Sequence, residues 1–147
     1  MSTPQRSLKS DAAVAEFQQI YDSWDQALAR NDPDALIELY ATDATLESPL
    51  VPHILGSGQG ILKGHAELRP FFELISKRKP HIRGHYRTAF LTDGKNKMIF
   101  EYPRATPHGE QMDFIEVMEV KDGLIQHHRV YWGWFGFKVL HENAYYR

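Results

Sequence analysis

A glutamate and a histidine lie on apolar strands that are close together in the sequence. Residues 112–134 read MDFIEVMEVKDGLIQHHRVYWGW, two largely apolar runs joined at Asp122-Gly123, which is a strong signal for a β-hairpin. If the connection is a three-residue loop ending in a left-handed glycine, Glu116 lies directly opposite His128. An acid and an imidazole on one apolar surface are the components that proton transfer requires. A two-residue turn would instead place Glu116 opposite Arg129, as an ordinary cross-strand ion pair.

Two interpretations of this pair are open from the residues alone. As a catalyst, Glu116 would use an apolar setting, because such a setting disfavours the charged form of any carboxyl group. As a structural residue, it would be a buried glutamate paired with Arg129. His128 has the side-chain type that titrates closest to neutral pH, so a catalytic role and a hydrogen-bonded structural role are equally open. Its neighbour His127 should point to the opposite face of the strand.

The other candidate binding residues are mostly aromatic or apolar. Four share the predicted inner face of the hairpin, namely Phe114, Met118, Val130 and Trp132. Trp24 and Tyr40, on elements earlier in the chain, are expected to line the same cavity, although an aromatic stripe is equally typical of a core. His53 lies in an apolar segment and would either line the mouth of the pocket or face the solvent.

The composition excludes several classes of function. The chain has 147 residues, 42% of them hydrophobic, which fits a single domain (residues 1–147) with a real core. A net charge of −2 and the lack of a basic stripe argue against a nucleic-acid partner. The sequence has no cysteine, no secretory signal and no run of about 20 apolar residues that could span a membrane. We therefore expect a cytoplasmic protein with neither a membrane nor a nucleic-acid partner.

The sequence predicts neither a metal nor a cofactor. Its eight histidines show no HExxH or comparable spacing. GSGQG, at residues 56–60, lacks the strand–turn–helix setting and the lysine of a phosphate-binding loop. A small apolar molecule is the expected ligand.

Helices are predicted in the first half of the chain. Residues 1–9 are polar and expected to be flexible. Apolar residues three or four apart predict a helix from Asp11 to Arg30, and Asp32-Pro33 predicts the cap and first residue of a short helix that ends near Tyr40. A third helix should begin near Gly64, and Pro70 predicts a kink or a late start for it.

Strands dominate the second half. A short strand at residues 45–48 precedes an apolar loop at 49–60 that could act as a lid. Longer strands are predicted at 81–91 and 97–104, with turns at Asp93-Gly94 and near Pro107, before the hairpin described above. Residues 136–147 show no clear period and are expected to form a C-terminal tail.

Helices followed by long antiparallel strands predict an α+β fold. Apolar residues occur on both faces of the strands, which suggests that one face covers the helices and a cavity while the other meets a partner. We expect a homodimer through the outer sheet face, whose residues would be Ile115, Val117, Ile125, His127, Arg129 and Tyr131.

Four segments resemble the nuclear-transport-factor-2-like superfamily, and within it the SnoaL-like and ketosteroid-isomerase-like branch. NDPDALIELYATDATLESP resembles the helix–turn–strand entry of that fold, and Lys63-Gly64-His65 resembles the start of its third helix. MDFIEVMEVKDG and LIQHHRVYW resemble its last two strands. The resemblance runs from Ala13 to Trp134. It implies a cone-shaped roll, in which a curved antiparallel sheet wraps around the N-terminal helices and leaves an apolar pocket open at one end.

The resemblance also implies roles for individual residues. The carboxylate base of ketosteroid isomerases falls at Ser48, the oxyanion-hole tyrosine at Trp24 and a supporting tyrosine at Phe72. Their protonated aspartate, a known example of a carboxylic acid kept neutral by an apolar site, falls at Glu116. In SnoaL-like cyclases and related dehydratases, acids or histidines on the sheet face transfer protons, and Glu116 with His128 fits that pattern.

These observations lead to one main hypothesis and two alternatives. The main hypothesis is a cofactor-free acid/base enzyme, of the isomerase, cyclase or dehydratase type, acting on a small apolar ring-containing carbonyl or hydroxyl compound. His128 would be the base and Glu116 the acid or oxyanion donor, with Trp24 and Ser48 positioning the substrate. The alternatives are a non-catalytic small-molecule-binding module and a dimeric accessory protein whose cavity is packed shut.

Overall fold

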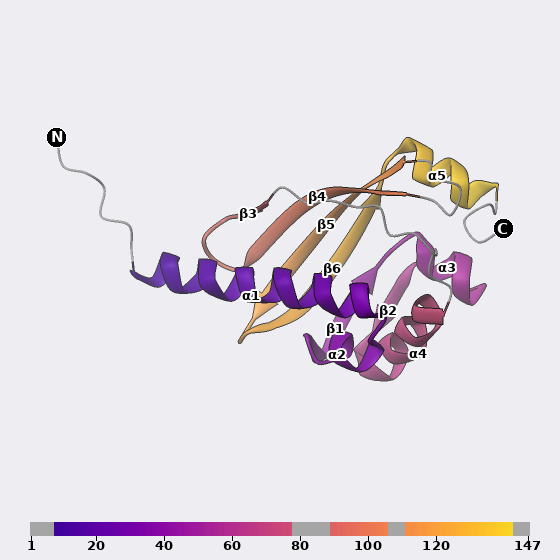
Figure 1. Cartoon of the computed structure of the whole chain (residues 1–147). Coiled ribbons are helices and arrows are strands. Elements are labelled where there is room, and N and C mark those ends of the chain that lie inside the picture. Colours follow the sequence, from indigo (N-terminus) through magenta and orange to yellow (C-terminus); the bar gives the residue numbers. More distant parts are fainter. Residues whose placement is uncertain (1–7, 78–88, 106–110, 143–147) are drawn as a thin grey trace.

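The computed structural model of the chain describes residues 8–77, 89–105 and 111–142. These residues form an α+β fold in which a curved six-stranded sheet is covered on one face by helices (Figure 1). This confirms the predicted fold class. The long helix α1, Leu8–Arg30, lies across the sheet, and shorter helices gather at one sheet edge. No helix in the described part of the chain is long and apolar enough to cross a membrane.

The first two helices follow from their local sequence. Helix α1 begins three residues before the predicted Asp11 and buries a stripe made of Phe17, Ile20, Trp24 and Ala27. The side chain of Asp32 accepts a hydrogen bond of 2.9 Å from the backbone nitrogen of Ala35, so it caps α2, Pro33–Ile37, as predicted. Helix α2 ends earlier than predicted because Tyr40 already belongs to a strand.

The segment after α2 is more regular than its sequence suggested. Strand β1 runs over Tyr40–Glu47 and is longer than the predicted 45–48. The predicted loop contains a short helix, α3, Leu50–Leu55, which a left-handed Gly56 ends. Strand β2, Ile61–Lys63, leads into α4, Gly64–Lys77. Pro70 lies inside α4, so the prediction of a late start for this helix is wrong.

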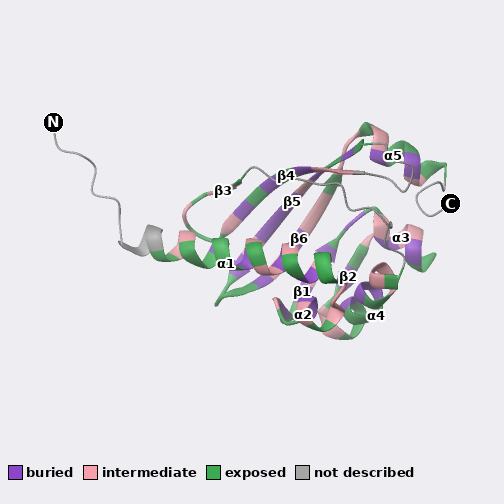
Figure 2. Ribbon diagram, viewed as in Figure 1, coloured by how far each residue is buried: buried purple, intermediate pink, exposed green. Residues whose placement is uncertain are grey.

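The remaining strands complete the sheet. They are β3, Phe90–Thr92, β4, Lys97–Ala105, β5, Gln111–Lys121, and β6, Leu124–Trp132. The order is β2-β1-β6-β5-β4-β3, with β1 and β6 parallel and every other neighbouring pair antiparallel. Most of the predicted strand 81–91 and the turn near Pro107 lie outside the described residues. Figure 2 shows buried and exposed residues alternating along β4, as expected for a strand with one face on the core.

The β5–β6 hairpin has a two-residue turn followed by a bulge. Asp122 and Gly123 both have positive φ, 52° and 78°, as such a tight turn requires. Lys121 therefore pairs with Leu124, and an unpaired Gln126 then shifts the register by one residue.

The bulge makes both predicted registers wrong. Beyond it, Glu116 pairs with Val130 and His128 pairs with Met118. Glu116 and His128 still share the inner face, because the turn and the bulge together shift the register by an even number of residues relative to the three-residue loop. The two-residue turn, which precedes the bulge, changes the face of Ile125, which was predicted on the outer face. It lies fully buried in the core instead, opposite Val120.

The last described element is a helix that the sequence did not predict. Helix α5, Trp134–His141, occupies much of the expected tail and contacts β5 and β6. It buries Gly136 against the indole of Trp132, where an added Cβ would lie 2.8 Å from Cε3 of the ring. Glycine is required here because the ring leaves no room for a side chain.

We expect Gly136→Ala to lower the melting temperature, at a cost of about 1–3 kcal/mol, because the new methyl group forces Trp132 or α5 to move. Gly58→Ala is the matched control, since a Cβ at Gly58 meets no atom within 4 Å. Thermal unfolding of both variants tests the contact. Equal melting temperatures for the two variants would show that the contact with Trp132 does not select glycine.

Candidate active site

Glu116 and His128 meet on the inner face of the hairpin. Their strand positions are diagonal neighbours, and long side chains bridge that spacing. Oε2 of Glu116 lies 2.5 Å from Nε2 of His128, and the two residues are only 3% and 2% exposed. The distance and the burial are those of a strong, charge-assisted hydrogen bond.

Three further side chains extend this contact into a buried chain of hydrogen bonds. The hydroxyl of Tyr102 donates to Oε1 of Glu116 at 2.7 Å. The hydroxyl of Tyr40 lies 2.8 Å from Nδ1 of His128, and the indole nitrogen of Trp24 donates to the Tyr40 oxygen at 3.3 Å. The chain therefore joins α1, β1, β4, β5 and β6.

The donors in this chain fix the tautomer of His128. An indole N–H can only donate, so the Tyr40 oxygen accepts from Trp24 and its own hydrogen is available for Nδ1 of His128. We therefore assign the proton of His128 to Nε2, from which it is donated to Glu116. In this arrangement both ring nitrogens are bound within the protein, and neither faces a ligand.

The same surroundings keep Tyr40 protonated. Burial raises the pKa of its hydroxyl well above the usual value of 10.0, the nearby Glu116 raises it further, and the hydrogen bond from Trp24 opposes both effects only in part. Tyr40 is thus a permanent donor at any physiological pH.

Glu116 and His128 line an apolar pocket. The pocket encloses about 580 Å³ of empty space, a volume that includes solvent at its open mouth. Seven of the other predicted site residues also line it: Trp24, Tyr40, Ser48, Phe72, Phe114, Val130 and Trp132. The hydroxyl oxygen of Ser48 accepts a hydrogen bond from the backbone nitrogen of Leu50 at 3.2 Å, which holds it at the start of α3.

Two predicted site residues do not line this pocket. Met118 lies on the inner face, as expected, but it is fully buried in the core beside Met98. His53 belongs to α3 rather than to a loop, and it is not among the lining residues. Neither position could be excluded from the sequence, because the direction of each side chain relative to the pocket depends on tertiary packing.

Two polar lining residues, Tyr102 and Arg104, were not predicted from the sequence. Both lie on β4, two residues apart, and therefore point to the same face. The alternation of Phe100, Tyr102 and Arg104 in the predicted strand 97–104 was an available signal. Its meaning depended on the pairing of β4 with β5, which no local pattern specifies. Among the described residues, no group of three or more His, Asp or Glu side chains is placed to hold a metal ion.

The buried hydroxyl of Tyr40 predicts a pH dependence of stability. Because its folded pKa is raised above 10.0, the unfolded chain loses this proton first as the pH rises, so stability is retained below pH 10 and falls above it. We expect the unfolding free energy to fall less steeply above pH 10 in Tyr40→Phe than in the wild type. At neutral pH the variant should lose about 1 kcal/mol for the missing hydrogen bond.

Urea unfolding at several pH values measures this difference. Tyr131→Phe, which removes an exposed hydroxyl, is the control. Parallel pH profiles for the wild type and Tyr40→Phe would contradict the assignment.

Comparison with known proteins agrees with this architecture. No curated protein matches the sequence significantly. A SnoaL-like protein of unknown function from Burkholderia thailandensis has a similar structure, with a TM-score of 0.68, 21% identity, and coverage of 81% of this chain and 95% of that one. An NTF2-like protein of unknown function from Mesorhizobium loti gives a TM-score of 0.64 at 15% identity, covering 88% and 97%. TerC, co-crystallised with polyporic acid, gives 0.66 at 14% identity, covering 86% and 98%.

These likenesses concern the fold, since all are below 25% identity. The sequence itself gives the family assignment, because the model of the SnoaL-like domain matches residues 18–128. This range runs from within α1 to the middle of β6 and includes both members of the buried acid–imidazole pair. The chain belongs to the SnoaL-like family.

Proposed function

We propose that this protein is a cofactor-free acid/base enzyme, of the isomerase, cyclase or dehydratase type, that acts on a small apolar ring-containing carbonyl or hydroxyl compound. One observation carries the proposal. Glu116 faces an apolar pocket while its carboxylate is held by the side chains of His128 and Tyr102. Such a carboxylate is oriented and shielded from water before any substrate arrives.

We infer roles for these residues that differ from those expected from the sequence. His128 is not the group that meets the substrate, because both of its nitrogens are engaged with Tyr40 and Glu116. Trp24 is not the oxyanion donor, since its N–H is directed to Tyr40. Glu116 is the catalytic residue in this proposal, and His128 and Tyr102 are positioning residues that hold its carboxylate.

The carboxylate retains capacity for a proton. It has about four lone-pair sites, and His128 and Tyr102 occupy two of them. In the proposed reaction, Glu116 takes a proton from a carbon beside a carbonyl, and the electron pair of the broken C–H bond moves onto the carbonyl oxygen. The same proton returns at another carbon in an isomerisation, or leaves with a hydroxyl group as water in a dehydration. The hydroxyl of Ser48, at the pocket wall, can donate to the developing oxyanion.

A non-catalytic binding module is the second candidate. The observation in its favour is that the polar groups of the chain from Trp24 to Tyr102 all bind one another, as in a purely structural network. In that case a ligand would bind in the pocket and no product would form. The third candidate, an accessory protein with a cavity packed shut, is not supported, because the pocket is open.

Glu116→Gln tests the main proposal. Glutamine keeps the shape of the side chain but cannot accept a proton, so turnover should fall about 100-fold or more. Steroid, polyketide and terpenoid-like compounds that stabilise the protein in a thermal-shift screen supply the assay substrates. Asp113→Asn, an exposed position on the same strand, is the matched control. Turnover that is unchanged in a folded Glu116→Gln variant would reject the proposal.

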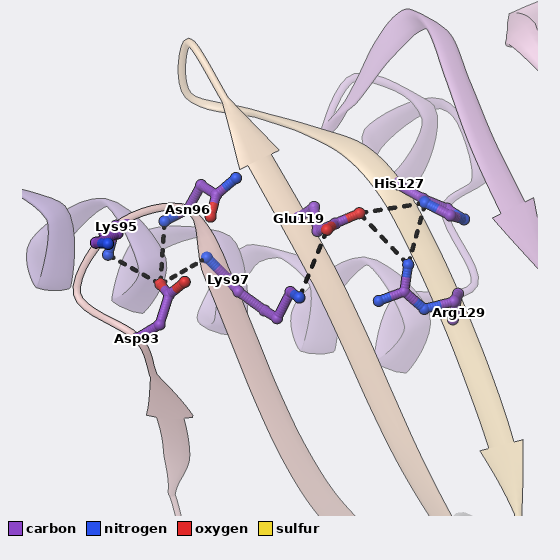
Figure 3. Close-up of polar contacts among 7 residues, drawn as sticks. All are labelled: Asp93, Lys95, Asn96, Lys97, Glu119, His127 and Arg129. Carbon is purple, nitrogen blue, oxygen red and sulfur yellow. Dashed lines mark hydrogen bonds and ion pairs between the residues drawn. The ribbon is translucent and has the colours of Figure 1, made fainter.

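We also propose that the protein forms a homodimer through the outer face of the sheet. Figure 3 shows acidic and basic side chains alternating across this face, with Glu119 between Lys97 on one side and His127 and Arg129 on the other. Exposed apolar side chains lie beside this cluster, among them Leu91, Ile99 and Tyr131. A face that holds both charge signs and apolar area can match a second copy of itself across a two-fold axis.

Tyr131→Glu should weaken this dimer at least 10-fold. Tyr131 is 53% exposed in the single chain and lies near Glu101. In the dimer, the new carboxylate would be buried close to Glu101 and to the new carboxylate of the second copy, and these like charges repel one another. Sedimentation equilibrium at micromolar concentration measures the effect. Leu55→Glu, which adds the same charge on α3, is the control. A wild-type protein that sediments as a monomer would rule out the dimer.

A further inference from the structure

The inner face of the sheet arranges the polar lining residues in successive cross-strand rows. Glu116 lies in a row with Phe100 and Val130. The next row holds three aromatic side chains, those of Tyr102, Phe114 and Trp132, and the row beyond it pairs Arg104 with Met112. An acid and a guanidinium are therefore separated by a full row of rings.

The aromatic row has the geometry of a wall for a flat molecule. The rings of Tyr102 and Phe114 are stacked with centroids 5.5 Å apart, and Trp132 meets Phe114 edge to face at 4.7 Å. All three residues line the pocket. A planar ring system of a ligand would find both ring faces and ring edges to pack against.

The two ends of this wall differ in charge. Among the described residues that line the pocket, Arg104 carries the one permanent positive charge. Arg104 pairs with Met112, and Glu116 follows Met112 by four residues on β5. The backbone positions of Glu116 and of the Arg104 row are therefore about 13 Å apart along the strand. A ligand anion beside Glu116 would be repelled, whereas an anion beside Arg104 would be attracted and kept apart from the carboxylate that must accept a proton.

We propose that the substrate is a flat cyclic compound with a carboxylate, which Arg104 binds at the far end of the aromatic row from Glu116. The proposal rests on the function proposed above and names its substrate class. Arginine suits this task better than lysine, because its planar fork of donors matches both oxygens of a carboxylate.

A matched pair of probes tests the proposal without turnover. 2-Naphthoate and 2-naphthamide have nearly the same shape and differ in charge, so the ratio of their dissociation constants isolates the carboxylate. We expect the wild type to bind naphthoate about 10-fold more tightly than naphthamide, the scale of one charge-assisted contact. Calorimetric titration at constant ionic strength measures both constants.

Variants at Arg104 assign the preference to this side chain. Arg104→Met should bring the two dissociation constants to within about twofold of each other, and Arg104→Lys should keep part of the preference. The lysine variant also serves if the methionine variant does not fold, as judged by circular dichroism. Failure of naphthoate to bind, equal binding of both probes by the wild type, or an unchanged preference in both variants would overturn the proposal.

Glu116→Gln separates this proposal from the catalytic one. The variant should retain the preference for naphthoate in full, because it removes a negative charge from the pocket. If Glu116→Gln has normal turnover and Arg104→Met still loses the preference, the catalytic role of Glu116 fails and the carboxylate site stands. If turnover falls in Glu116→Gln and the preference does not depend on Arg104, the carboxylate site fails and the catalytic role stands.

Discussion

The hydrogen bond between Glu116 and His128 is the interaction on which the rest of the site depends. A buried carboxylate is destabilising by several kcal/mol unless donors replace the water it has lost. His128 and Tyr102 supply two such donors, and His128 can do so only because Tyr40 satisfies its other nitrogen. Trp24 in turn orients Tyr40. One buried acid thus requires side chains from a helix and four strands. The hydrogen bonds of the site form only if each of these elements is correctly placed.

The parts of the fold that could be predicted are those set by local chemistry. Asp32 specifies a helix start because its side chain accepts a backbone hydrogen bond, and Pro33 does so through its fixed φ. Asp122-Gly123 specifies a hairpin turn. The parts that could not be predicted depend on distant contacts. Helix α5 forms where Gly136 packs on Trp132, and α3 is a single short helix whose Leu50 lines the pocket. Neither leaves a periodic pattern long enough to read from the sequence.

The site divides in the same way. Glu116 and His128 could be placed on one face because alternation along each strand is a local property. Tyr102 and Arg104 could not be assigned to the pocket, since that requires the register of β4 on β5, which the hairpin turn does not determine. Met118 shows the converse error. It lies on the predicted face, but it is fully buried in the core and does not line the pocket.

A single residue decides whether the acid and the imidazole meet at all. In a regular hairpin with this two-residue turn, Glu116 would pair with Arg129, and His128 would point to the outer face beside Val117. The unpaired Gln126, two residues before His128, restores the inward direction of the imidazole. Bulges are frequent next to active sites because they re-aim a side chain without disturbing the rest of the strand. Here the bulge brings His128 instead of Arg129 to Glu116 on the inner face, so the hairpin irregularity and the proposed chemistry have the same structural origin.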